Sequence, residues 1–114
     1  YFSASAVDCV GLDFTGAKLH NTQFVGLRLV GTRFVAADLQ GARFANIDGT
    51  DLDFRGANLT DARFVPGMRF TRTDFTGAVG LTVAQVMAMD LDAATLSTLP
   101  KEVYSELAAR WALV

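Results

Sequence analysis

Residues 37–46 read Ala37-Asp38-Leu39-Gln40-Gly41-Ala42-Arg43-Phe44-Ala45-Asn46, and this stretch contains one five-residue unit twice. Each unit has a small residue first, a polar residue second and a bulky apolar residue third. The bulky residue recurs at the same spacing along most of the 114-residue chain, at Phe14, Leu19, Phe24, Leu29, Phe34, Leu39 and Phe44, and after Gly49 at Phe54, Leu59 and Phe64. A period of five fits neither an α-helix nor a plain strand, so this repeat decides the fold.

The first and third residues of a unit point to the same side of an extended chain, because side chains two positions apart share a face. In the first unit, Ala37 and Leu39 therefore point inward and Asp38 faces water. An odd period would send the next bulky residue to the opposite face, so the chain must turn once in every unit. Turn-forming residues stand two places after the bulky ones, at Gly16, Asn21, Gly26, Gly31, Gly41, Asn46, Asp51, Gly56, Asp61 and Gly77. A chain that turns the same way at regular intervals winds into a solenoid.

These units resemble the Ala-(Asp/Asn)-(Leu/Phe)-x-x consensus of pentapeptide-repeat proteins, and Ala57-Asn58-Leu59-Thr60-Asp61 is a third close match. The resemblance spans roughly residues 7–80. It implies an all-β solenoid, a right-handed quadrilateral β-helix with four units in each coil. About three and a half coils are expected within residues 1–80. Residues 81–114 are expected to form a short C-terminal α-helical cap.

Coils of four units should stack residues twenty apart into columns, and the sequence contains such columns. One holds Phe14, Phe34 and Phe54, a second Leu19, Leu39 and Leu59, and a third Phe24, Phe44 and Phe64. The fourth, Cys9, Leu29 and Gly49, is irregular, and Gly49 leaves space that a neighbouring ring could fill.

After Phe64 the series slips by one residue, because the next inward pairs read Met68 with Phe70 and Thr73 with Phe75. Val65-Pro66-Gly67 is therefore predicted to carry a one-residue insertion, as a bulge or a wider corner. The predicted structural core consists of the ten bulky residues of the series together with Phe70 and Phe75.

Near Gly80 the period of five gives way to a helical pattern. Thr82-Val83-Ala84-Gln85 reads as a capping box, which predicts a helix from Val83 to about Asp90 with Val86 and Met87 turned inward. A second helix is predicted to begin near Pro100, with an apolar stripe that includes Tyr104, Leu107 and Trp111. Two interpretations of the stripe remain open. It closes the last coil as a cap, or Tyr104, Leu107 and Trp111 form a dimer or partner surface.

Few side chains are suited to catalysis, and the pattern brings no nucleophile together with a base. His20, the only histidine, falls on an outward position, and Cys9, the only cysteine, falls on an inward one. An acidic cluster, Asp48, Asp51 and Asp53, lacks the loop signature of a calcium site. The sequence therefore predicts no catalytic residue, no cofactor and no metal site.

The resemblance also implies a function, since some pentapeptide-repeat proteins are DNA mimics that bind type II topoisomerases. Such a mimic needs an acidic rod, yet residues 8–80 contain eight acidic and eight basic residues. The predicted walls mix charges, with Asp13, Arg33 and Asp53 on one wall, Lys18 and Asp38 on another, and Arg28 and Asp48 on a third. The fourth, with Gln23, Arg43 and Arg63, is biased, and it is basic.

The favoured hypothesis is a non-catalytic scaffold for protein–protein interaction whose partner the sequence does not identify. The alternative is a DNA mimic that binds or inhibits DNA gyrase or topoisomerase IV. For partners we also expect a homodimer, formed through a solenoid end or the C-terminal helix. The mixed walls argue against direct nucleic-acid binding.

No apolar stretch reaches the ~18 residues of a membrane span, and no signal segment opens the chain. We therefore expect no membrane contact and a cytoplasmic location. Phe2 and Ala4 already fit the phase of the repeat, from which we expect the chain to begin inside a solenoid.

Overall fold

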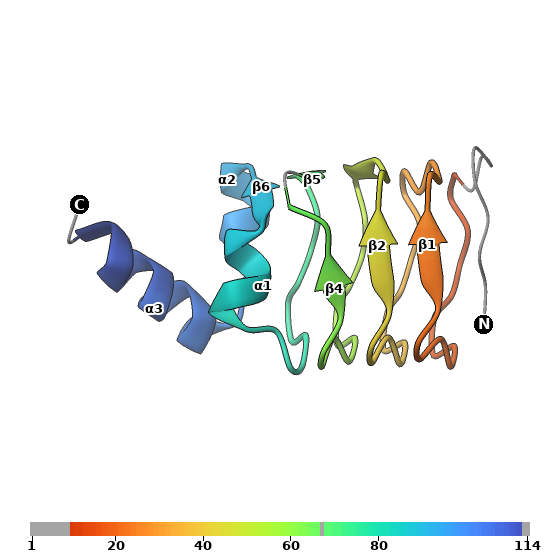
Figure 1. Ribbon diagram of the computed structural model, residues 1–114, viewed down its shortest axis with the longest axis horizontal. Coiled ribbons are helices and arrows are strands. Elements are labelled where there is room, and N and C mark those ends of the chain that lie inside the picture. Colours follow the sequence, from red (N-terminus) through yellow and green to blue (C-terminus); the bar gives the residue numbers. More distant parts are fainter. Residues whose placement is uncertain (1–9, 67, 113–114) are drawn as a thin grey trace.

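A computed structural model describes residues 10–66 and 68–112, the last two of them by their backbone only. The chain winds into coils that stack side by side as a rod, and α-helices lie at one end of it (Figure 1). Parallel bridges join residues twenty apart, namely Asp13 to Arg33, Lys18 to Asp38, Gln23 to Arg43 and Arg28 to Asp48. Because these bridges follow one another at steps of five residues, each coil has four walls. The predictions for Phe2, Ala4, Cys9 and Gly67 and for the Trp111 side chain lie outside the described residues.

Two parallel three-stranded sheets cover two of the walls. The first contains β1 (Gln23–Val25), β2 (Arg43–Ala45) and β4 (Arg63–Phe64) in that order. The second contains β3 (Gly49–Thr50), β5 (Met68–Thr71) and β6 (Met89–Leu91). Isolated parallel bridges join the coils on the other two walls, for example Arg33 to Asp53 and Asp38 to Asn58. The strands are short because the chain turns once in every unit.

All ten predicted corner residues adopt positive φ angles, between 51° and 71°. At one of these corners, Gly16 has a φ of 69° and the Ala17 amide donates to the Phe14 carbonyl at 3.0 Å. Ala36 and Arg72 also turn with positive φ, at 56° and 49°, although neither residue type favours that conformation. At these two corners the Ala36 amide donates to the Arg55 carbonyl of the next coil at 2.8 Å, and the Arg72 amide donates to the Asp92 carboxylate at 3.1 Å.

The predicted insertion is confirmed by the register of the sheets. Arg43 pairs with Arg63 twenty residues on, whereas Gly49 pairs with Phe70 twenty-one residues on. The extra residue therefore lies between Phe64 and Met68, and the next coil resumes the same four walls.

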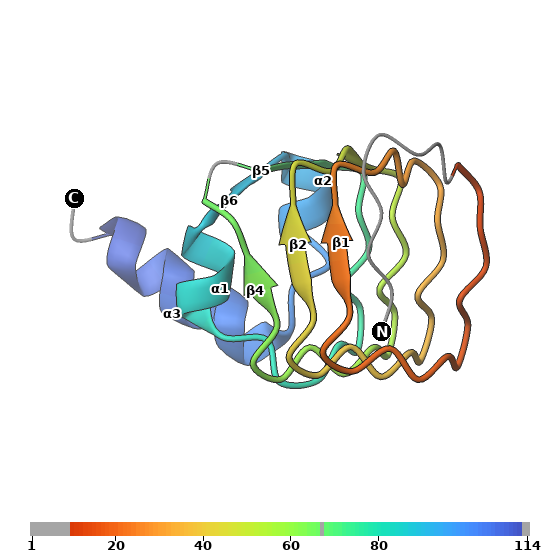
Figure 2. The same cartoon turned by 45° about the vertical axis from the view of Figure 1, so that its right-hand side comes forward.

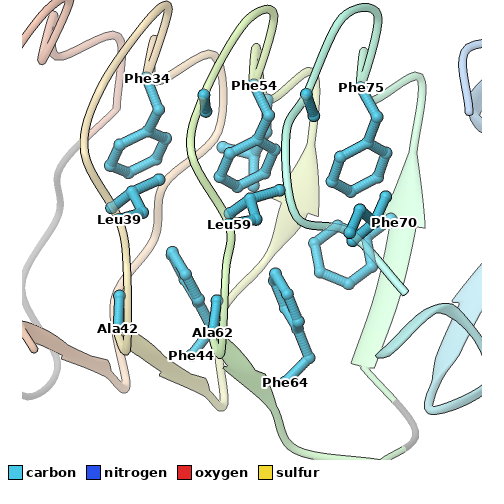
Figure 3. Close-up of a cluster of buried hydrophobic side chains, with 14 of the residues drawn as sticks. Phe34, Leu39, Ala42, Phe44, Phe54, Leu59, Ala62, Phe64, Phe70 and Phe75 are labelled. Carbon is cyan, nitrogen blue, oxygen red and sulfur yellow. The ribbon is translucent and has the colours of Figure 1, made fainter. Parts of the chain in front are cut away.

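The predicted columns stack through the centre of the rod. The ring centroids of Phe34 and Phe54, and those of Phe54 and Phe75, lie 5.2 Å apart with nearly parallel planes (Figure 3). Phe44 and Phe64 stack in the same way at 5.1 Å, and the two columns meet edge to face. Rings in such contacts stabilise one another beyond the burial of their area.

The C-terminal region contains α1 (Val83–Met87), α2 (Ala93–Leu96) and α3 (Lys101–Ala112). The capping box at Thr82 and Gln85 is confirmed, and α3 begins where it was predicted, directly after Pro100. The predicted extension of the first helix to Asp90 is wrong, because residues 89–91 form β6 and pair with β5. The inward position of Met87 is also wrong, since its side chain is 60% exposed. The open edge of β5 attracts a parallel strand, and the alternation Met89-Asp90-Leu91 suits one.

Candidate protein-binding surfaces

The structure buries ten of the twelve predicted core side chains, and Phe14 and Leu19 are half-buried. Because the core fills the interior of the rod, surfaces available for binding must come from outward residues, corners or the two ends. Figure 2 shows α1 and α3 at one end of the rod, next to β4 and β6.

Side chains of the cap replace the hydrogen bonds that a further coil would make. The backbone amide of Thr73 donates to the Thr95 hydroxyl at 3.0 Å, and that of Phe75 to the Thr98 hydroxyl at 2.9 Å. The Asp92 carboxylate accepts from the Arg72 amide at 3.1 Å. Hydroxyl and carboxylate oxygens thus take the place of the carbonyls of another coil. The backbone amides of Arg72, Thr73 and Phe75 are therefore all paired.

The Gln85 side chain pairs with backbone carbonyl groups of the rod in the same way. Its Nε2 donates to the carbonyl oxygens of Leu59 and Ala62, both at 2.9 Å, while its Oε1 accepts from the Thr82 amide at 2.6 Å. One side chain therefore caps α1 and also pairs with two backbone carbonyls on either side of the Asp61 corner. The sequence predicted only the first of these roles.

The residues of the predicted partner surface on α3 differ in their exposure to solvent. Tyr104 is 45% exposed, whereas Leu107 is 3% exposed and belongs to the core of the chain. Leu107 is therefore corrected from a partner contact to a cap contact, because α3 turns this residue toward α1. The Trp111 side chain is not described. Beside Leu107 lies a half-open apolar cavity of about 300 Å³, lined by Val86, Met87, Met89, Leu91, Leu96 and Leu107.

Charges of opposite sign face each other on most of the outer surface. The Arg69 and Asp90 side chains approach to 3.4 Å across neighbouring coils, and Arg72 binds both oxygens of Asp51 at 2.7 and 3.2 Å. These hydrogen bonds from the Arg72 guanidinium hold the pKa of the Asp51 carboxyl below its ordinary value. Opposite charges thus also meet near the helical end of the rod, at Arg69 and Arg72, although Asp53 pairs in register with Asp74 on another wall.

The wall of β1, β2 and β4, which we call the arginine wall, differs from the others. It consists of Gln23, Arg43 and Arg63, paired in register. Arg43 and Arg63 are exposed, and neither forms an ion pair within the described part of the chain. This is the basic wall that the sequence predicted.

His20 lies at the rim of a polar hollow at a corner of the rod. The hollow has a volume of about 500 Å³ and is lined by His20, Asn21, Asp38, Gln40, Gly41 and Asp61. Among the described residues, no three histidine, cysteine or acidic side chains gather as metal ligands would.

The predicted acidic cluster does not converge on a common point. Asp48 accepts hydrogen bonds from the Thr50 amide and hydroxyl at 3.1 and 2.6 Å. Asp51 binds Arg72, and Asp53 binds Arg55 at 2.8 Å. Each carboxylate therefore has a separate structural partner.

The family model for pentapeptide repeats matches eight copies over residues 4–34 and 28–64, which is more than half of the chain. The chain belongs to the pentapeptide-repeat family. Pentapeptide-repeat proteins form right-handed quadrilateral β-helices, in agreement with the four walls and parallel bridges described above.

Two solved structures of other pentapeptide-repeat proteins are similar to this one. A trypsin-treated variant of QnrB1, a plasmid-mediated fluoroquinolone resistance protein, is 28% identical with a TM-score of 0.63. The match covers 67% of this pentapeptide-repeat protein and 38% of QnrB1. A pentapeptide-repeat protein from the thylakoid lumen of Arabidopsis thaliana is 29% identical over 64% of this chain and 53% of its own, with a TM-score of 0.31. No curated protein matches the chain.

Pentapeptide-repeat proteins are generally non-catalytic structural or interaction proteins. Within the described residues of this pentapeptide-repeat protein, the longest helix has 12 residues, and none is long and apolar enough to cross a bilayer.

Proposed function

We propose that this pentapeptide-repeat protein is a rigid, non-catalytic scaffold that binds another protein through its outer walls or its helical end. The observation that carries the proposal is the stacked phenylalanine core, in which the Phe54 ring is fully buried between two others at 5.2 Å. Such a core holds outward side chains at fixed spacings on flat walls, and preorganised surfaces bind with a smaller entropy cost.

The proposed architecture is a right-handed quadrilateral β-helix of about three and a half coils over residues 1–80. In this proposal residues 81–114 are the cap segment, and β6 within it continues one of the sheets. The hydrogen bonds of Gln85, Thr95 and Thr98 support the assignment of this segment as a cap.

In-cell photo-cross-linking in the native host tests the scaffold function. Benzoylphenylalanine is placed at one outward position on each wall, Arg33, Lys18, Gln23 and Arg69, and at Tyr104 on α3. A binding scaffold should give a discrete cross-linked protein from some of these positions and not from others. Failure to form a discrete product at all five positions would contradict the proposal.

A homodimer through α3 is a second proposal, supported by the exposed Tyr104 and the apolar cavity beside Leu107. Sedimentation over a concentration series should then show a dimer that Tyr104→Glu weakens. A monomer at every concentration excludes self-association.

The alternative function is binding to a type II topoisomerase, for which the likeness to QnrB1, a fluoroquinolone resistance protein, is the supporting observation. The alternating charges, such as Arg69 beside Asp90, count against a DNA mimic, because a duplex presents negative charge continuously. A DNA gyrase supercoiling assay, with and without a fluoroquinolone, decides between them. Protection or inhibition at micromolar protein supports the alternative, and unchanged supercoiling in both conditions removes it.

A further inference from the structure

Two arginine residues are paired in register on the arginine wall. Figure 1 looks onto this wall, where β1, β2 and β4 follow one another along the rod. Arg43 on β2 pairs directly with Arg63 on β4, so their backbones lie about 4.8 Å apart. Like charges placed directly opposite each other on neighbouring strands destabilise a sheet.

One other wall contains a like-charge pair in register, and there the chain supplies the counter-ion itself. Asp53 pairs with Asp74, and the Arg55 side chain lies 2.8 Å from an Asp53 oxygen and 4.0 Å from an Asp74 oxygen. Arg55 stands two residues after Asp53, at the adjoining corner.

The arginine wall lacks such a counter-ion at the equivalent positions. The residues two places after Arg43 and Arg63 are Ala45 and Val65, both apolar. Val25 and Val65 are half-buried at this corner, so an apolar edge runs beside the two cations. Within the described residues, neither arginine reaches a carboxylate.

We propose that the arginine wall binds an acidic protein segment, one that places two carboxylates on Arg43 and Arg63 and an apolar side chain against the Val25 and Val65 edge. This inference rests on the protein-binding function proposed above. Arginine binds carboxylates through strong, charge-assisted hydrogen bonds, often in pairs. The carboxylates of the segment would neutralise this like-charge pair from outside the chain, as the Arg55 guanidinium neutralises Asp53 and Asp74 on the other wall.

The same chemistry distinguishes a protein segment from a nucleic acid. Two cations contact about two phosphates, and nucleic-acid affinity depends on neutralising many of them. The whole chain carries a net charge of −2, which repels a polyanion at longer range. A phosphate group also has no apolar surface to pack against the Val25 and Val65 edge.

The test compares two variants that remove the same charge from different places. Arg43→Gln/Arg63→Gln removes both positive charges from the arginine wall. It introduces the residue type that Gln23 already places at the third position of that wall. Lys18→Gln/Lys101→Gln is the matched control, since both lysines are exposed and lie away from this wall. The probe is a fluorescein-labelled peptide of Glu-Leu-Glu-Ser repeats, followed by fluorescence anisotropy at low ionic strength, with a labelled DNA duplex as the second probe.

We expect the wild-type protein to bind the peptide, the arginine double variant to bind it about tenfold more weakly, and the lysine variant to change affinity less than about twofold. Equal loss in both variants, or no binding by the wild type, overturns the proposal. Tighter binding of the duplex that depends on the same arginines overturns it in favour of a nucleic-acid surface.

The cross-linking experiment separates this inference from the general function. If Gln23 gives the product and Arg43→Gln/Arg63→Gln abolishes it, the acidic-segment proposal is supported. If positions on other walls give products and Gln23 gives none, this inference fails while the scaffold function stands. If no position gives a product, the scaffold function itself fails.

Discussion

The Phe70 ring occupies the space into which a side chain at Gly49 would project. A Cβ atom built on Gly49 would lie 2.7 Å from Phe70 Cδ1 and 2.6 Å from the Arg69 carbonyl oxygen. Both distances are far below van der Waals contact, so the small residue in one coil and the large residue in the next form a complementary pair.

Gly49→Ala should therefore destabilise the protein by about 1–3 kcal/mol through overpacking. Urea unfolding measures the change. Gly49 does not need a left-handed backbone, so strain in φ does not contribute. In a double-mutant cycle, Gly49→Ala/Phe70→Leu should cost less than the sum of the two single changes, because a smaller side chain relieves the contact. Simple additivity would contradict the pairing.

Phe54→Ala should cost about 3–5 kcal/mol, because the ring is fully buried and stacked on both sides by Phe34 and Phe75. The matched comparison is Phe14→Ala, in the same column at the other end of the described rod. Phe14 is half-buried and stacks on one ring, at 5.4 Å, so its loss should cost less than half as much. Equal costs in thermal unfolding would show that the column does not act as a continuous core.

Gln85→Ala should destabilise the cap by about 1–3 kcal/mol, because the Ala62 carbonyl oxygen would lose its donor and the Leu59 carbonyl oxygen would keep only the Ala62 amide. Thr82→Ala is the control, since it removes only the hydrogen bond from the Gln85 amide. Hydrogen exchange should show faster exchange in α1 for both variants. Faster exchange that extends into the coil of residues 59–62 should appear only with Gln85→Ala.

The stability of the protein should fall at acid pH, partly because the Asp92 carboxylate becomes protonated. Hydrogen bonds from Thr95, and then from the Arg72 amide, hold the pKa of the Asp92 carboxyl below its ordinary value of 3.8. A folded-state pKa below the unfolded one stabilises the protein above the unfolded pKa, and that contribution is lost as the pH falls through the folded pKa.

Asp92→Asn keeps an N-capping oxygen for α2 but removes the charge, so its stability should depend less on pH between about pH 5 and pH 2. Asp61→Asn is the control, because the Asp61 carboxylate forms no hydrogen bond or ion pair with the described residues. Denaturant midpoints across this range measure both. An Asp92→Asn profile as steep as that of the wild type would contradict the assignment.

The repeat allowed much of this structure to be predicted. The ten corner residues, the columns and the insertion after Phe64 all follow from a local pattern, because each unit repeats the same two requirements, an inward pair and a turn. The excess of positive charge at Arg43 and Arg63 was predicted from the same five-residue spacing. Ala36 and Arg72 were missed as corners because their residue types carry no turn preference, and the hydrogen-bond partners of their amides, Arg55 and Asp92, lie about twenty residues away in the sequence.

The C-terminal segment was less predictable. Met89-Asp90-Leu91 continues a helical pattern in sequence, yet it pairs with β5 because an open strand edge is available. Leu107 was left between a cap contact and a possible partner contact, because a helical stripe does not reveal which of its residues the chain covers itself. The roles of Thr95 and Thr98 have no local signal, since their hydrogen-bond partners lie more than twenty residues away.

The sequence by itself determined that this chain coils with a period of four five-residue units, which residues face inward and which wall carries unbalanced positive charge. Those features depend on spacing alone. The tertiary structure alone decided how the last coil ends and that the Arg55 side chain bridges Asp53 and Asp74. It also decided that no carboxylate of the described residues pairs with Arg43 or Arg63. Such contacts depend on where side chains from different coils meet, and packing in three dimensions sets that.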